Sequence, residues 1–173
     1  MKRLLTVTIL LFASLLYSQS KFDINNLIDR GGLKYAPNDD EPYTGKVFDF
    51  YDNKGLKKLD GRYRKGLMNG KWTYYHENGK IMSKGNYKNG DGSYPDRFAD
   101  EYKKEYPPYG GRNGKWTRWH ENGQKETEGT YKDGKPDGLI TWWFDNGQKE
   151  EEGTFKDGRL IESSAWDEDG NKQ

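Results

Sequence analysis

The sequence repeats itself with a period of 24 residues. Three segments align without a gap: residues 69–90, 113–134 and 137–158. Within the last two, Gly114 recurs as Gly138. An earlier copy covers residues 44–66 with one extra residue, and a partial copy begins at residue 159. Such self-similarity is typical of repeat proteins, in which each unit packs against its neighbours.

Each copy has the pattern of a β-hairpin. In the copy at 69–90, Trp, Thr and Tyr favour a first strand over residues 71–76. Asn78-Gly79 then predicts a type I′ turn, in which both central residues take positive φ. A second strand is predicted over 80–88, and Gly85 within it indicates a bulge or a close approach of other backbone. The repeats therefore predict an all-β fold, an antiparallel meander of stacked β-hairpin repeats.

Aromatic residues recur at fixed positions of the repeat and mark its core. The first column is Val47, Trp72, Trp116 and Ile140, the second is Phe50, Tyr75, Trp119, Trp143 and Trp166, and the third is Tyr63, Tyr87, Tyr131 and Phe155. We interpret the second column as a structural aromatic ladder along the sheet. The first two columns are three residues apart, so they lie on opposite faces or a bulge shifts the phase.

The composition agrees with an aromatic core. From residue 21 onward, Leu, Ile, Val and Phe make up 19 of 153 residues, whereas 24 residues are Phe, Trp or Tyr. Aromatic side chains bury much apolar area each, so such a chain folds without many aliphatic residues. The composition excludes a helical bundle, a membrane-spanning bundle and an aliphatic α/β enzyme core.

Residues 1–20 have the pattern of a secretory signal peptide. A positively charged start precedes an uncharged run from Leu4 to Tyr17, and Ser18 and Ser20 fit cleavage near Ser20. The run is shorter than the roughly 20 residues that a transmembrane helix needs. We therefore expect a secreted or periplasmic protein. The chain has no Cys, which excludes a lipid anchor at the cleavage site and any disulfide.

An insertion interrupts the repeats. The usual step of four residues between neighbouring copies becomes 24 between Gly90 and Gly114. We divide the chain into a cap (21–43), two repeats (44–90), the insertion (91–112), two more repeats (113–158) and a partial repeat or C-terminal cap (159–173). In the insertion, Ser93 and Pro95 predict the start of a short helix. The segment is either a lid on neighbouring hairpins or a partner-binding element, and its candidate binding residues are Tyr94, Phe98, Tyr102, Tyr106 and Tyr109.

Charge and catalytic residues restrict the function. Without residues 1–20 the chain has 27 basic and 28 acidic side chains, a net charge of −1. This charge is interspersed, which excludes a nucleic-acid surface and disfavours binding to an anionic membrane. His76 and His120 share one repeat position with Tyr51 and Phe144, so we interpret it as an aromatic packing position. We expect no catalytic residues, no metal site and no cofactor.

The repeat unit resembles the bacterial variant of the MORN repeat. The resemblance rests on Gly-Lys-Trp near the start of the unit, Asn-Gly at its turn and Gly-x-Tyr-Lys-Asn/Asp-Gly at its end, and it covers roughly residues 27–170 apart from the insertion. It implies an elongated sheet, and its bacterial members are often labelled antitoxins of toxin–antitoxin systems. Eukaryotic relatives are mostly described as protein-binding or membrane-associated scaffolds.

The sequence as a whole predicts an exported, non-enzymatic repeat scaffold for protein–protein or cell-surface interaction. Its expected partner is another protein or a cell-surface component. Two alternatives remain at this point. One is an antitoxin-like protein of a toxin–antitoxin system, and the other is a glycan-binding module that uses exposed aromatic residues.

Overall fold

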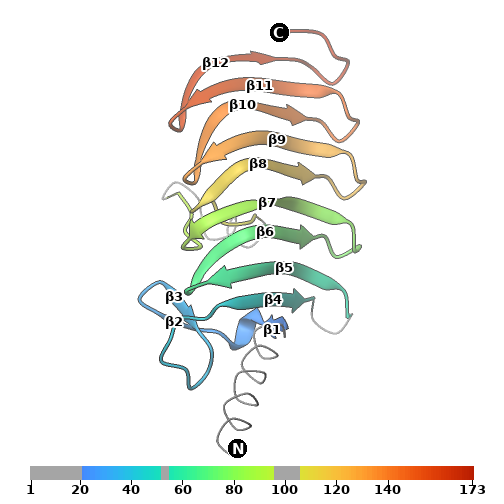
Figure 1. Cartoon of the computed structure of the whole chain (residues 1–173). Helices are drawn as coiled ribbons and strands as arrows, with labels where there is room; N and C mark the ends of the chain where they lie inside the picture. The colour runs from blue at the N-terminus through green and yellow to red at the C-terminus, as the bar shows by residue number, and fades with distance from the viewer. Residues whose placement is uncertain (1–20, 52–54, 96–105) are drawn as a thin grey trace, which may run out of the picture.

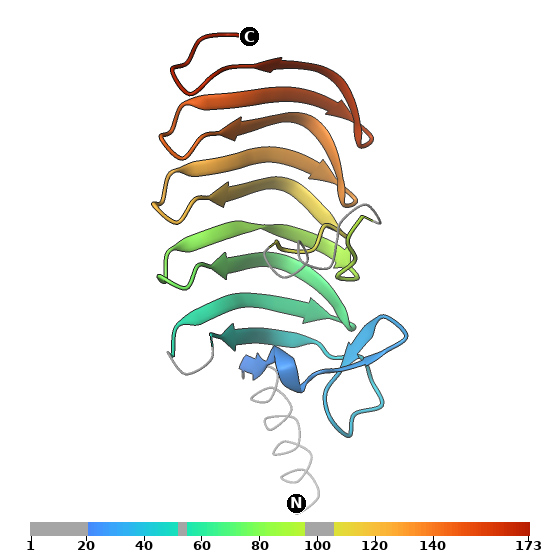
Figure 2. The same ribbon diagram turned by 180° about the vertical axis from the view of Figure 1, so that it is seen from behind.

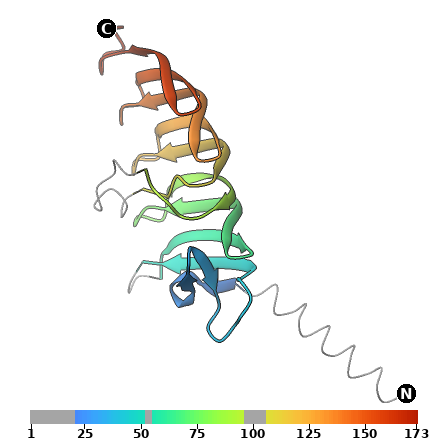
Figure 3. The same ribbon diagram turned by 90° about the vertical axis from the view of Figure 1, so that its left-hand side faces the viewer.

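The computed structural model describes residues 21–51, 55–95 and 106–173. Ten strands form one elongated sheet (Figure 1). They are β1 (Lys21–Asp23), β4 (Gly45–Phe50), β5 (Lys57–Arg64), β6 (Leu67–Tyr75), β7 (Ile81–Gly90), β8 (Arg112–Trp119), β9 (Lys125–Lys132), β10 (Lys135–Trp143), β11 (Lys149–Lys156) and β12 (Arg159–Ala165). From β4 to β12 each strand pairs antiparallel with the next, and β1 joins β4 in parallel. The predicted meander of stacked hairpins is confirmed, and Figure 3 shows it from the side.

The N-terminal part of the chain lies beside the first hairpin. A 3₁₀ turn, η1 (Ile24–Asn26), follows β1, and β2 (Ile28–Arg30) and β3 (Leu33–Tyr35) form a separate two-stranded sheet. The predicted signal peptide lies outside the described residues. In the part of the chain that the structure describes, no helix has the length and hydrophobicity to cross a membrane.

The hairpins turn at two kinds of loop. Two-residue loops such as Lys65-Gly66 have positive φ at both residues, as a type I′ turn requires. At the other end of the strands, Gly79 has a φ of 81° but Asn78 has no positive φ, and the Gly79 N–H donates to the His76 carbonyl. The type I′ prediction for Asn78-Gly79 is therefore wrong. The loop there is longer, so a type I turn followed by one left-handed glycine closes it.

The two faces of the sheet carry different columns. The inner face holds the buried core, which includes most of the first and third columns: Val47, Trp72, Trp116, Ile140, Tyr63, Tyr87 and Tyr131. The outer face carries the second column, as the contact of Tyr75 with Asp60 and Lys57 shows. In each of these hairpins the pairing register also shifts immediately before the residue that belongs to this column, for example between Tyr74 and Tyr75. The columns therefore lie on opposite faces, and a bulge is present as well.

A glycine in each second strand makes room for a large side chain of the strand that follows. A Cβ built on Gly85 would overlap the ring carbons of Trp116, and one on Gly61 would overlap those of Trp72. The close approach predicted for Gly85 is confirmed, and the ring of a neighbouring strand is the group that approaches. This arrangement lets the large rings lie flat over the backbone of the sheet.

Candidate functional site

The described ends of the insertion between β7 and β8 lie against the inner face of the sheet (Figure 2). We call its described residues, 91–95 and 106–111, the strap. Its two arms are joined because the Ser93 carbonyl accepts the N–H groups of Tyr109 and Gly110. The Tyr94 hydroxyl also donates to the Tyr106 carbonyl at 2.8 Å. The helix predicted here falls mainly on residues 96–105, outside the described residues, and the strap itself contains no helix.

Arg112 at the start of β8 anchors the strap. Its side chain is only 6% exposed. Its Nη2 donates to the Pro107 carbonyl at 2.6 Å and its Nε to the Pro108 carbonyl at 2.9 Å. The guanidinium also lies 3.8 Å from the ring centroid of Tyr109 and 4.5 Å from that of Trp116. These contacts replace a carboxylate partner with carbonyl oxygens and ring faces, both of which attract a cation.

Tyr87 supports the same segment from β7. Its hydroxyl donates to the Pro108 carbonyl at 2.6 Å, so this carbonyl accepts two side-chain hydrogen bonds. Burial raises the pKa of Tyr87 well above the ordinary value, which keeps the hydroxyl protonated and able to donate. The Pro-Pro segment of the strap is therefore fixed to the sheet through its carbonyl oxygens.

Beside the strap, the inner face forms a groove with a volume of about 1180 Å³. Its floor consists of apolar and aromatic side chains of β5 and β6: Leu59, Tyr63, Met68, Trp72 and Tyr74. Its wall is the strap, through Tyr94, Tyr106, Pro107 and Pro108. The hairpin loops at one end contribute His76, Glu77, His120 and Glu121. An aromatic floor with polar groups at its edge is typical of a binding site.

Arg118 of β8 lies at the boundary of this groove. Its Nε is bonded to Glu126 Oε2 at 2.5 Å, and its guanidinium lies 3.6 Å from the ring centroid of Tyr106. Its Nη1 is buried without a hydrogen-bond partner, the one such side-chain atom among the described residues. A buried donor without an acceptor costs free energy.

The turn end of the groove is acidic. Burial raises the pKa of Tyr51, and the negative charges of Glu77, Asp49 and Glu121 raise it further. Among the described residues, Lys58 pairs with Asp49 at 3.2 Å and Arg118 pairs with Glu126. Glu77 and Glu121 line this end of the groove.

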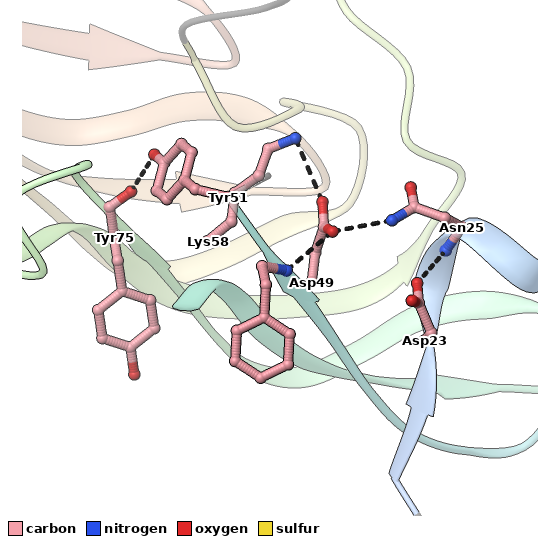
Figure 4. A network of polar contacts seen from close by, with 7 residues as sticks. Asp23, Asn25, Asp49, Tyr51, Lys58 and Tyr75 are labelled. Atoms are coloured by element: carbon pink, nitrogen blue, oxygen red, sulfur yellow. Dashed lines mark hydrogen bonds and ion pairs between the residues drawn. The ribbon is translucent and has the colours of Figure 1, made fainter. Parts of the chain in front are cut away.

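A network of polar contacts joins β4 to the 3₁₀ turn and to β5 (Figure 4). Asp49 accepts from the Asn25 side chain at 2.8 Å and pairs with Lys58. Asp23 in turn accepts the Asn25 N–H at 2.8 Å, which fixes the 3₁₀ turn on the inner face. Through this turn Ile24 reaches the lining of the groove.

The histidines have a structural partner in the next hairpin. His76 Nε2 lies 2.8 Å from the Trp119 carbonyl, and His120 Nε2 lies 3.0 Å from the Trp143 carbonyl. Tyr51, at the same repeat position, donates to the Tyr75 carbonyl at 2.5 Å (Figure 4). The position predicted as aromatic packing therefore also joins successive hairpins by hydrogen bonds. No group of three or more His, Asp or Glu residues with the arrangement of a metal site occurs within the described ranges.

The outer face covers its aromatic column with lysine side chains. The Nζ atoms of Lys84, Lys125 and Lys149 lie 4.9, 5.3 and 4.8 Å from the ring centroids of Trp119, Trp143 and Trp166, respectively. Lys125 and Lys149 also pair with the acidic residue three positions later. The ring faces of this column are thus already used by cations of the same chain.

The structure brings some of the predicted binding residues together. Tyr94 and Tyr106 line the groove, and Tyr109 packs against Arg112 and Tyr131. Phe98 and Tyr102 lie outside the described residues. Of the predicted aromatic ladder, Phe50 is 44% exposed, and Tyr75, Trp119, Trp143 and Trp166 are half-buried on the outer face.

Sequence reasoning missed Arg112 and Arg118. In the other aligned copies the position of Arg112 holds Met68 and Pro136, and that of Arg118 holds aromatic residues. An arginine at an apolar repeat position is a usable signal, because it indicates that something special to that copy must satisfy the charge. Both arginines belong to β8, the strand that follows the insertion.

Comparison with known proteins identifies repeats in the same region. Residues 68–89, 112–133 and 136–157 match the family model described as the MORN repeat variant. They coincide with the hairpins β6–β7, β8–β9 and β10–β11. No curated protein and no solved structure matches the chain. MORN repeats are generally non-catalytic scaffold modules that mediate protein or membrane interactions. The chain thus carries three repeats similar to the MORN repeat variant, with the strap inserted between the first and the second.

Proposed function

We propose that the protein is an exported, non-enzymatic repeat scaffold that binds another protein or a cell-surface component in the groove beside the strap. The observation that carries this proposal is the groove itself. Its floor comes from the repeats and its wall from the segment that interrupts them, so the insertion creates a surface that a regular repeat array lacks. Tyr and Trp are the residues that most often dominate binding energy at protein interfaces.

Export is the second part of the proposal, and the pattern of residues 1–20 supports it. The mature chain is expected to begin at or next to Lys21. Mass spectrometry of the protein recovered from the culture medium or cell envelope measures this end directly. Recovery of only the uncleaved chain from the cytoplasm would overturn this part.

A pull-down tests the binding role. The mature protein is the bait, with an extract of the cell envelope and medium as the source of partners. The double variant Tyr94→Ser/Tyr106→Ser changes the wall of the groove, and Phe50→Ala is its control on the outer face. We expect a partner that the wild type and Phe50→Ala recover and that the groove variant loses. Equal recovery by all three folded proteins, verified by circular dichroism, would contradict the proposal.

The same experiment addresses the two alternatives. A toxin among the recovered proteins would support the antitoxin association, which otherwise stays a prediction. Glycan binding on the outer face is disfavoured, because a lysine ammonium lies over the half-buried rings on which a sugar would stack.

A further inference from the structure

Charges of both signs are mixed along the sequence, but the two ends of the sheet differ in net charge. Residues 21–90, which contain the strands β1 to β7, have 14 basic and 9 acidic side chains, a net charge of +5. Residues 113–173, which contain most of β8 and the strands up to β12, have 9 basic and 14 acidic side chains, a net charge of −5. Because the strands follow one another along the sheet in chain order, the elongated molecule has a basic end and an acidic end (Figure 1).

One position of the outer face changes its charge in the second hairpin. This position directly precedes the glycine of each second strand, and in successive hairpins it holds Asp60, Lys84, Glu128 and Glu152. The three carboxylates each pair with a lysine three residues earlier. In the second hairpin both partners differ, since Lys84 replaces the acid and Ile81 replaces the lysine.

Three cations precede Lys84 across the sheet, one on each of the strands β4, β5 and β6. Lys46 lies directly opposite Arg62, and Lys71 lies opposite Asn86 of β7. Each of the three is next in sequence to a buried core residue, so its side chain lies on the outer face. All three are exposed, and among the described residues none of them takes part in an ion pair. Like charges directly opposite each other in a sheet repel, so Lys46 and Arg62 destabilise it slightly unless an anion lies between them.

Lys71 and Lys84 meet Lys115 of β8 at a hollow of the outer face with a volume of about 330 Å³. Among the described residues that line it, only Glu128 is acidic. Lys115 Nζ lies 2.8 Å from Glu128 Oε1, whereas Lys84 Nζ lies 4.9 Å from the ring centroid of Trp119. A ring face attracts a cation but does not neutralise it. The hollow therefore has three ammonium groups against one carboxylate.

We propose that the basic patch formed by Lys46, Arg62, Lys71 and Lys84 binds an acidic segment of a partner protein, rich in Asp and Glu. The patch lies on the outer face, away from the groove, so the inference goes beyond the proposed function and adds a second binding surface. Carboxylates of the segment offset the repulsion between Lys46 and Arg62 and balance the excess charge of the hollow. The four cations come from four consecutive strands, so the patch extends along the sheet and suits a linear ligand.

Other polyanions fit the outer face less well. Single-stranded nucleic acid binds largely by stacking its bases on aromatic rings, and lysine ammonium groups lie over the rings of Trp119 and Trp143. An anionic membrane is a plane, and an elongated sheet that lies on it would bring its acidic end to the same surface. A segment of a protein can be confined to the patch.

Synthetic peptides test this inference on the full-length protein as its host produces it. The probe is a fluorescein-labelled peptide of alternating Glu and Gly, and its binding is measured by fluorescence anisotropy. A comparison peptide replaces every Glu by Gln. We expect a Kd of about 10 to 100 μM for the Glu peptide and at least about tenfold weaker binding of the Gln peptide. Salt at about 1 M should abolish the difference, because it screens exposed charges. Equal binding of the two peptides at low salt, or no binding of the Glu peptide, overturns the inference.

Matched variants locate the bound peptide. Arg62→Gln/Lys71→Gln removes two cations of the patch, whereas Lys132→Gln/Lys135→Gln removes two exposed cations outside it, so the net charge changes equally. We expect the first variant to weaken binding of the Glu peptide about threefold to tenfold and the second to leave it unchanged, with both folds verified by circular dichroism. Equal effects would show attraction to the net charge alone and contradict the patch.

Lys84→Glu gives the second hairpin the acidic residue that the other three hairpins have at this position. The sheet accommodates an acid there, so the variant should fold. We expect it to weaken binding of the Glu peptide at least about tenfold, because a repulsive charge replaces an attractive one. Unchanged binding would contradict the part assigned to Lys84.

Two further probes distinguish the sources of negative charge: vesicles of phosphatidylcholine with phosphatidylserine, and a single-stranded oligonucleotide. If either binds in a manner that depends on Arg62 and Lys71 while the Glu peptide does not bind, the patch has another ligand and the inference is wrong. The groove variant Tyr94→Ser/Tyr106→Ser should bind the Glu peptide as the wild type does. Failure of the groove proposal is therefore distinguishable from failure of this one.

Discussion

At the scale of single residues, a glycine of one strand lies beneath an aromatic ring of the neighbouring strand. The ring of Trp116 lies over Gly85, and its indole N–H donates to the Asn86 carbonyl at 3.0 Å. Trp72 repeats the arrangement over Gly61, with its N–H bonded to the Arg62 carbonyl at 3.2 Å. These glycines have no positive φ, so the space above them, not an unusual backbone, requires glycine.

Gly85→Ala is therefore expected to destabilise the protein. The added methyl group would overlap the indole ring of Trp116, which is held by its hydrogen bond and is almost fully buried. Overpacking of this kind costs roughly 1–3 kcal/mol. The free energy of unfolding, measured by urea titration with circular dichroism, checks the value.

Gly153→Ala is the matched control for this prediction. Its Cβ would meet Leu160 Cδ1 and the ring of Phe155 at 2.9 Å each, near the edge of the sheet where side chains have room to move. A smaller loss of stability is expected there. If the two variants cost the same, rigid packing of Trp116 is not the reason for the glycine.

At the scale of elements, the strap is held by few side chains. The Arg112 side chain donates hydrogen bonds to two strap carbonyls, while the strand that carries it pairs independently with β7 and β9. The position holds Met68 in the preceding repeat, where there is no strap. Release of the strap and loss of the sheet are therefore separable events.

Arg112→Met is expected to free the strap and leave the sheet folded. The variant removes two hydrogen bonds and the stacking on Tyr109, but it keeps an apolar side chain at a buried position. Limited proteolysis should cut between residues 91 and 111 at least about tenfold faster, because cleavage follows the population of the open form.

Lys115→Met on the same strand provides the control, since Lys115 is exposed and pairs with Glu128 on the outer face. Its cleavage rate is expected to match that of the wild type. An Arg112→Met protein that is cut no faster than this control would show that the strap does not depend on the arginine.

The elements also show where sequence reasoning succeeds. The 24-residue repeat predicted the hairpins, because glycine and aromatic positions recur with the geometry of the sheet. The turn type at Asn78-Gly79 was predicted wrongly, because the same dipeptide closes loops of different length. Only the hydrogen bonding of the loop distinguishes these loops. The strap was predicted as an insertion, but its anchoring by Arg112 at the Pro107 and Pro108 carbonyls is special to this copy, so the repeat pattern does not encode it.

At the scale of the whole molecule, buried tyrosines take the place of an aliphatic core. Burial raises the pKa of Tyr63 to about 12, and it raises the pKa of Tyr74, Tyr87 and Tyr131 above the ordinary value of 10 as well. The folded state therefore holds the protonated phenols more tightly than the unfolded state does. Their contribution to stability is complete below pH 10 and is lost as the pH rises toward the folded pKa values.

The protein is accordingly expected to unfold in alkaline solution, with stability falling steeply above about pH 10. Tyrosinate absorbance and circular dichroism, followed in one titration, measure ionisation and folding together. The absorbance of the buried tyrosines should rise only where the circular dichroism signal of the sheet is lost. A rise at the ordinary pKa with the sheet intact would contradict their burial.

The sheet also lacks contacts between distant hairpins. In the part of the chain that the structure describes, substantial contacts between strands of the ten-stranded sheet join only strands that are neighbours in it. The terminal strand β12 has one such neighbour, and Leu160 and Ile161 are exposed on it. Fraying is therefore expected to begin at β12 and to advance strand by strand. A force applied to the C-terminus would peel the sheet in steps and reach the strap, which contacts β9, only after β12 and the β10–β11 hairpin had opened.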